Sequence, residues 1–94
     1  MFDVRVNENG EILLFGRFDA SQVEKARAVL EHVSQSTIVN FGDLDYISSA
    51  GLGVLLGTQK KLNESGASLK LVNMNKHIRD VFRFAGFDTI FEIE

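Results

Sequence analysis

The sequence predicts a small single α/β domain spanning residues 1–94, with a mixed β-sheet in which an N-terminal hairpin is followed by alternating helices and strands. The hairpin is indicated by two short apolar segments on either side of an Asn-Gly pair. The alternation that follows favours right-handed βαβ crossovers and therefore a parallel part of the sheet. With 94 residues, of which 45% are hydrophobic, the chain can form one compact core.

The hairpin occupies the first sixteen residues. Phe2 to Val6 alternates apolar and polar side chains, which is the period of a half-buried strand. Asn9 and Gly10 both tolerate a positive φ, so they favour a tight turn. Residues Glu11 to Gly16 are then expected to form the returning strand.

The first helix is expected to begin at Ser21, because Glu24 follows three residues later and completes a capping-box pattern. The short β-rich segment from Thr37 to Phe41 predicts a central strand. The inner face of the helix should carry the apolar residues that recur at helical spacing, namely Val23, Ala26, Leu30 and Val33.

A second helix is predicted from about Ala50 to Asn63, ending at Ser65-Gly66, with a strand from Ser68 to Asn73 behind it. Its buried stripe should consist of leucines at helical spacing, namely Leu52, Leu55, Leu56 and Leu62.

A third helix should start with Asn75 as its cap and end at Gly86, followed by a short strand from Thr89 to Ile93. The inner face expected for this helix is Ile78, Val81, Phe82 and Ala85. The eight phenylalanines lie mostly at periodic apolar positions and are interpreted as core, although Phe84 and Phe87 need not both face inward.

The most informative stretch is Asp45 to Leu56, because it places two hydroxyls, those of Ser48 and Ser49, where a strand gives way to a helix. The start of a helix presents unpaired backbone N–H groups and the positive end of the macrodipole. A neutral serine there is a good cap, and a phosphorylated serine would place a dianion where a helix tolerates one best. Local sequence alone favours the neutral cap for either residue.

The segment Asn40 to Gly53 resembles the signature of STAS domains, the family of bacterial anti-sigma factor antagonists. The similarity extends over nearly the whole chain. It includes Gly16 to Asp19 ahead of the first helix, Ser65 to Ala67 with Leu69 to Val72 after the second, and Val81 to Phe87 in the last helix. Ser48 stands where the family often has Asp, and Ala50 where it often has a second Ser.

The resemblance implies that Ser49 is a phosphorylation site and that Asp19 is the family's acidic position near it. It implies that the unphosphorylated form binds an anti-sigma factor with serine kinase activity and thereby frees a sigma factor. Phosphorylation would end binding, and a serine phosphatase would reset the switch. The implied partner-binding residues are Asp19, Ser48, Ser49, Ala50, Gly51, Leu52 and Gly53.

Other functional classes have less support. There is no cysteine for thiol chemistry, and no set of nucleophile and base suggests a catalytic residue, so no enzyme, cofactor or metal is expected. The net charge of −3 and scattered basic residues argue against direct binding of nucleic acid. Neither a signal peptide nor a membrane-spanning run is recognisable, so we expect a cytoplasmic protein without membrane attachment.

Two alternatives remain open at this point. The glycines at 51, 53 and 57 only weakly resemble a dinucleotide fingerprint, but a STAS-type sensor of a small ligand or nucleotide could use the same helix start. Gly51 and Gly53 are expected to allow close backbone approach, whereas Gly57 reflects tight packing or an interface. Asp43 and Asp45 are placed in loops; together with Asp19 they could bind Mg²⁺, but turn formation is the preferred interpretation for these two.

Overall fold

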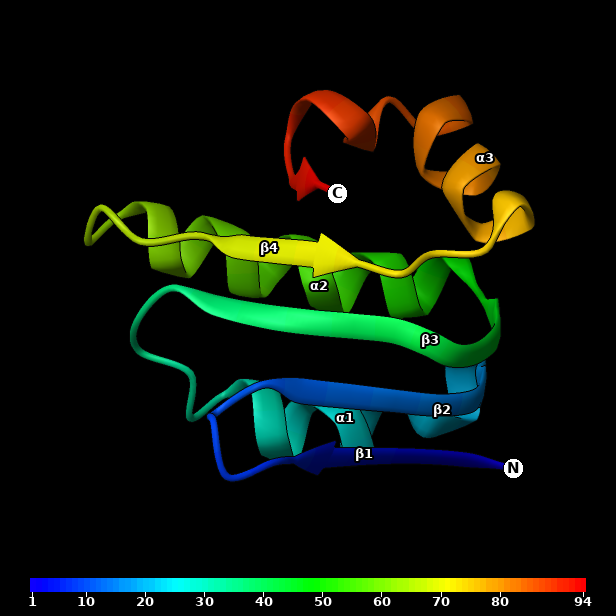
Figure 1. The fold of residues 1–94 in the computed structure, drawn as a ribbon, viewed down its shortest axis with the longest axis horizontal. Helices are drawn as coiled ribbons and strands as arrows, with labels where there is room; N and C mark the ends of the chain where they lie inside the picture. The colour runs from blue at the N-terminus through cyan, green and yellow to red at the C-terminus, as the bar shows by residue number, and fades with distance from the viewer.

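The computed structural model describes all residues from 1 to 94, which form a five-stranded sheet with three α-helices (Figure 1). In chain order the elements are β1 (Phe2–Val6), β2 (Ile12–Phe18), the short 3-10 helix η1 (Ala20–Gln22), α1 (Val23–Leu30), β3 (Thr37–Ile47), α2 (Ser49–Asn63), β4 (Leu69–Val72), α3 (Lys76–Phe84), the 3-10 helix η2 (Phe87–Thr89) and β5 (Glu92–Ile93).

The sheet is mixed, as the sequence predicts. Strand β1 pairs antiparallel with β2, and every later pair is parallel. The spatial order β1-β2-β3-β4-β5 follows the order of the chain, which is visible as a regular change of colour across the sheet in Figure 1. Because β2, β3 and β4 run in the same direction, the loops that follow them leave from one edge of the sheet.

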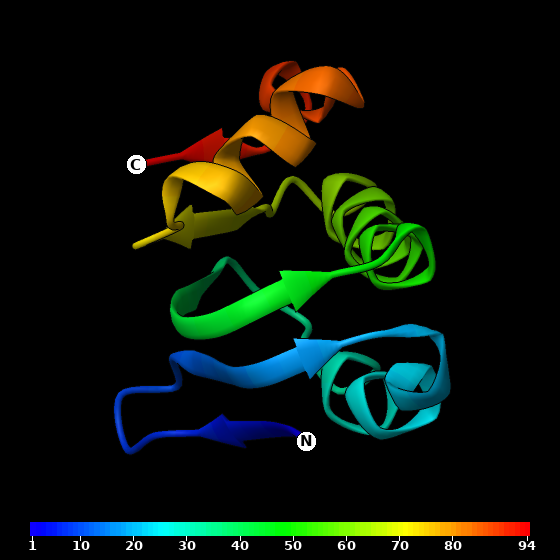
Figure 2. The same cartoon turned by 90° about the vertical axis from the view of Figure 1, so that its right-hand side faces the viewer.

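Helices α1 and α2 lie side by side on one face of the sheet (Figure 2). Alternate residues of the strands point to this face and form the core, as their burial shows. The inward set includes Ile12, Leu14, Val39, Phe41, Leu69 and Leu71. Helix α3 adds Phe82, whose ring lies edge-on to that of Phe41 at 5.8 Å and to that of Phe91 at 5.7 Å between centroids. None of the helices is long and apolar enough to cross a membrane.

Several local predictions are confirmed. Gly10 has a φ of +79° in the hairpin turn, and Gly86 has a φ of +76° after α3. The side chain of Asn75 accepts a hydrogen bond from the backbone N–H of Ile78 at 2.8 Å and so caps α3. These features depend on neighbouring residues only, which is why sequence spacing is enough to find them.

The cap of the first helix was predicted wrongly. Ser21 lies within η1, and the carboxylate of Asp19 caps this 3-10 turn by accepting a hydrogen bond from the Ser21 N–H. Helix α1 continues from η1 at Val23 without a side-chain cap of its own. An acidic residue two positions earlier therefore performs the role assigned to the serine.

Strand β3 is much longer than predicted and runs to Ile47. Asp43 and Asp45, expected in loops, lie within this strand because it continues to pair with β2 through two shifts of register. The inner face predicted for α3 also needs correction, since Ala85 is exposed whereas Ile78 and Phe82 are buried.

Candidate functional site

The site predicted from the sequence lies at the edge of the sheet where the parallel strands β2 and β3 end. Phe18 and Ile47 are paired across these strands, and the Ser48 N–H donates a hydrogen bond to the Phe18 carbonyl oxygen at 2.9 Å. Asp19 and Ser48 consequently begin two neighbouring loops. The register of the sheet thus brings residues that are about thirty positions apart in sequence to one edge.

The two serines of this edge have different roles. Ser48 is the N-cap of α2, with an extended backbone (φ −90°, ψ 170°), and its hydroxyl accepts a hydrogen bond from the Gly51 N–H at 3.2 Å. Ser49 is the first helical residue; its side chain is exposed and makes no hydrogen bond. The hydroxyl of Ser49 therefore stabilises no part of the fold through a hydrogen bond, and it is accessible to solvent.

The start of α2 is electrostatically suited to an anion. Its first turn contains no acidic side chain, and the helix extends over 15 residues. The N–H groups of Ser49 and Ala50 have no acceptor within the helix, as is general for a first turn. Because the positive end of the helix dipole lies there, a phosphate on Ser49 would be tolerated without a change of fold.

Asp19 forms no hydrogen bond with Ser48 or Ser49. Its Oδ1 accepts hydrogen bonds from the Ser21 hydroxyl at 2.6 Å and from the Ser21 N–H at 3.0 Å. The Ser21 hydroxyl makes the largest contribution to lowering the pKa of the Asp19 carboxyl, with the Ser21 N–H and the charge of Arg17 adding to it. Asp19 is thus a charged carboxylate that shapes the loop beside Ser48.

Gly51 and Leu52 lie on the inner side of α2. A Cβ atom on Gly51 would come within 2.9 Å of Ile47 Cγ1 and 3.1 Å of Phe18 Cγ. The close approach predicted at Gly51 is therefore correct, and it seats the first turn of α2 against the ends of β2 and β3. Leu52 is also buried. Packing of these two residues against the core fixes the position of the exposed Ser49 on the opposite side of the helix.

Gly53 and Gly57 lie on the outer side of α2, and the close packing predicted for Gly53 is wrong. A Cβ atom on either glycine would meet nothing within 4 Å, and neither has a positive φ. Tight packing does not explain Gly57 either. With Ser49 these glycines form a row at spacings of four, which places all three on one face of the helix.

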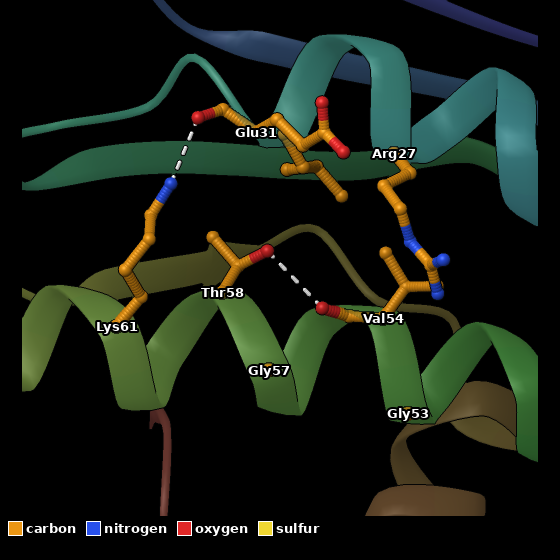
Figure 3. Close-up of a pocket in the computed structure, with 8 residues that line it drawn as sticks. Arg27, Glu31, Gly53, Val54, Gly57, Thr58 and Lys61 are labelled. Carbon is orange, nitrogen blue, oxygen red and sulfur yellow. Dashed lines mark hydrogen bonds between the residues drawn. The ribbon is translucent and has the colours of Figure 1, made fainter.

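The same face of α2 borders a groove against α1 (Figure 3). The groove has a volume of about 210 Å³, and Figure 3 shows its walls to be formed by the two helices. Lys61 crosses it and donates a hydrogen bond to the Glu31 carbonyl oxygen at 2.8 Å. The residues lining the groove are Arg27, Leu30, Glu31, Gly53, Val54, Gly57, Thr58 and Lys61.

This groove was not predicted from the sequence, although the spacing of Ser49, Gly53 and Gly57 indicates one exposed face of the helix. The α1 side was not foreseeable, because the contact between the helices depends on how both cross the sheet. No group of three potential metal-binding side chains comes together, and Asp43 lies on β3 rather than beside Asp19 in a loop.

Comparison with known proteins places this geometry in a family, because the STAS domain profile matches residues 4–94. The chain belongs to the STAS domain family. An anti-sigma-B factor antagonist of Bacillus subtilis is 30% identical over 97% of this chain and 87% of that protein. BtrV of Bordetella bronchiseptica, provisionally named an anti-sigma factor antagonist, is 37% identical; the match covers 80% of this chain and 66% of BtrV.

The fold agrees with solved structures of the family. The Bacillus cell fate determinant SpoIIAA in its phosphorylated form aligns with a TM-score of 0.70 and 25% identity, covering all of this chain and 91% of that one. The small α/β STAS fold predicted from the sequence is therefore confirmed. STAS proteins of the anti-sigma factor antagonist group are regulatory binding proteins rather than enzymes.

Proposed function

We propose that this STAS domain is an anti-sigma factor antagonist of a bacterial cytoplasm, switched by phosphorylation of Ser49. The observation that carries the proposal is the exposed hydroxyl of Ser49, which has no hydrogen-bond partner at the start of α2 while Ser48 supplies the cap. The names of the relatives support the antagonist function, and the related SpoIIAA exists in a phosphorylated form whose structure has been solved.

In the proposed mechanism the unphosphorylated domain binds an anti-sigma factor that is also a serine kinase, and this frees a sigma factor. Transfer of phosphate to Ser49 adds about −1.5 to −2 charge at neutral pH. The free N–H groups of the first turn stabilise this charge, so the domain stays folded. Binding is lost locally, because the partner surface would have to accommodate a bulky dianion and desolvate it. A serine phosphatase restores the binding form.

The proposed contact surface follows the exposed residues of the edge. Ser49, Ala50 and Gly53 face outward, whereas Gly51 and Leu52 act by holding the helix start in position. Gly57 and the groove beside α1 continue the same face. Because Gly53 and Gly57 have no side chains, a partner could approach the helix backbone closely at these positions. This would explain two glycines that packing within the domain does not require.

The test is a kinase reaction with the cognate anti-sigma factor and ATP, followed by mapping of the phosphate and measurement of affinity. Wild type and Ser48→Ala should incorporate phosphate on residue 49, and Ser49→Ala should incorporate none while still binding. Ser49→Asp should bind at least about tenfold more weakly, a loss of 1.4 kcal/mol. Ser34→Ala is a matched control at an exposed serine in the loop before β3, outside this site, and should behave as wild type.

Phosphate on another residue in wild type, or wild-type affinity of Ser49→Asp, would contradict the proposal. Calorimetry with ATP and GTP adds a separate readout. Micromolar binding of either nucleotide by the isolated domain, together with unaltered partner affinity of the Ser49 variants, would favour a STAS-type sensor instead.

A further inference from the structure

Phe84 is an exposed aromatic residue that the fold does not require. It is the last residue of α3, and 80% of its surface is accessible. The inward positions of the same helix are filled by Ile78 and Phe82, which are completely buried. The Phe84 ring has the guanidinium of Arg83 as its neighbour, 5.5 Å from the ring centroid. A large aromatic ring is thus presented to the outside beside a cation.

The outer side of α3 is positive although the chain as a whole is negative. The helix carries Lys76, Arg79 and Arg83 against one carboxylate, that of Asp80, whereas the net charge of the chain is −3. Asp80 pairs with Arg83 at 2.9 Å and lies 3.7 Å from the Lys76 amine. Arg79 forms neither an ion pair nor a side-chain hydrogen bond. Its guanidinium therefore keeps all its donors available.

Arg79 and Arg83 also line a surface hollow of about 320 Å³. The other lining residues are Ile93 of β5, which is half-buried, and Asp88 of η2. Asp88 forms no ion pair with either arginine, so it does not occupy the guanidinium of Arg79. The hollow thus combines the unpaired Arg79 with the apolar side chain of Ile93. Phe84 does not line the hollow but is exposed next to Arg83 at the end of the same helix.

We infer that this surface, formed by Arg79, Arg83, Phe84 and Ile93, is a second docking site, which binds an acidic segment of a partner protein. A carboxylate of that segment pairs with the fork of Arg79, and an apolar side chain packs on Phe84. Aromatic and arginine side chains are the residues that most often dominate the binding energy of protein interfaces. The site is on a different helix from Ser49, and we expect binding there to be independent of the phosphorylation state.

The experiment is a titration of the ¹⁵N-labelled chain with an acetylated, amidated hexapeptide of sequence Glu-Glu-Leu-Glu-Glu-Leu, up to about 1 mM, which corresponds to weak binding. The expected result is a set of amide shifts centred on Arg79, Arg83, Phe84 and Ile93. Phe84→Ser and Arg79→Glu should each reduce affinity about tenfold or more. Both side chains are exposed, so thermal melts should confirm that the variants fold.

Two control variants test whether peptide binding is specific to the α3 surface and independent of Ser49. Lys60→Glu reverses an exposed charge on α2 and should bind the peptide with no more than the loss expected from general charge, about twofold. Ser49→Asp should bind the peptide as wild type does. Loss of peptide binding in Ser49→Asp would overturn the independence of the two surfaces.

Other outcomes would overturn the inference itself. These are the absence of shifts at 1 mM peptide, shifts elsewhere, or wild-type affinity in both Phe84→Ser and Arg79→Glu. Binding to phosphatidylglycerol vesicles without binding to the peptide would assign the surface to a membrane. A concentration-dependent dimer abolished by Phe84→Ser would assign it to a second copy of the chain. None of these results affects phosphorylation of Ser49, which the kinase reaction reports separately.

Discussion

The inner and outer sides of α2 both carry glycine, for opposite reasons. On the inner side, Gly51 is required because a Cβ atom would come within 2.9 Å of Ile47 and 3.1 Å of Phe18. On the outer side, Gly53 and Gly57 leave open space, and each costs the helix about 0.5–1 kcal/mol relative to alanine. The inner glycine is explained by packing within the domain. The outer pair calls for an explanation from outside it, and partner docking supplies one.

The largest effect should come from enlarging the inner glycine. Gly51→Val is expected to lower the free energy of unfolding by about 1–3 kcal/mol, because the side chain must displace Ile47 or the Phe18 ring. Urea denaturation measures this loss. Gly53→Val is the matched control: with open space around it, its stability should stay within about 0.5 kcal/mol of wild type. Equal destabilisation by the two variants would show that the two sides of the helix do not differ as described.

The next effect separates the two serines. Ser48→Ala removes the cap of α2 and should cost about 1 kcal/mol of stability. Ser49→Ala removes a hydroxyl without hydrogen bonds, so its cost should be below about 0.5 kcal/mol. Both values can be measured by thermal or chemical denaturation under the same conditions. A greater loss in Ser49→Ala would mean that the hydroxyl of residue 49 is structural.

Filling the outer side should reveal a conflict between stability and binding. Gly57→Ala is expected to raise the free energy of unfolding by about 0.5–1 kcal/mol, since alanine favours the helix and its methyl group meets no neighbour. Affinity for the anti-sigma factor should fall, because the methyl group projects from the face that continues from Ser49. Glu8→Ala, an exposed change in the turn between β1 and β2 and away from α2, should leave affinity nearly unchanged. A Gly57→Ala variant that is more stable and binds equally well would remove the groove from the contact surface.

The smallest effect concerns the loop beside the inner side of α2. Ser21→Ala should raise the pKa of Asp19 towards its ordinary value, because the Ser21 hydroxyl is the main cause of the lowered pKa. The carboxyl resonance of Asp19 can be followed by NMR during an acid titration. A carboxyl whose pKa is lowered by folding stabilises the fold above its unfolded-state pKa, near pH 4, and this contribution disappears as the pH falls through the folded-state value. An unchanged titration in Ser21→Ala would mean that the backbone N–H and Arg17 dominate.

Caps and turns that depend on residues close in sequence could largely be predicted, whereas contacts between distant segments could not. Asn75 was recognised as a cap because its side chain and the N–H that it accepts are three residues apart. Ser21 was mistaken for one because an added 3-10 turn gives Asp19 that role. The length of β3 could not be predicted either, since its second half is held by pairing with β2.

The candidate site shows the same division. The position of Ser49 at a helix start followed from the sequence pattern, and the structure distinguishes it from Ser48 through one hydrogen bond. The different surroundings of Gly51 and Gly53 depend on which side of α2 faces the strand ends. Gly51 and Gly53 are separated by one residue and look equivalent in sequence. In the structure they lie on opposite sides of α2, and only Gly51 faces the strand ends.

The order of the strands has a consequence for how this sheet is assembled. Because the sheet is ordered β1-β2-β3-β4-β5, each strand pairs with the one that follows it in the chain. The hairpin closes a short loop, and each parallel pair closes a crossover of 18 to 21 residues, so no pairing has to enclose more than one crossover. During synthesis, when the N-terminal part emerges first, the hairpin can form before the rest exists, and each later strand can pair with the strand made just before it. The residues around Ser49 at the carboxyl ends of β2 and β3 are all present once α2 has emerged, before β5 is made.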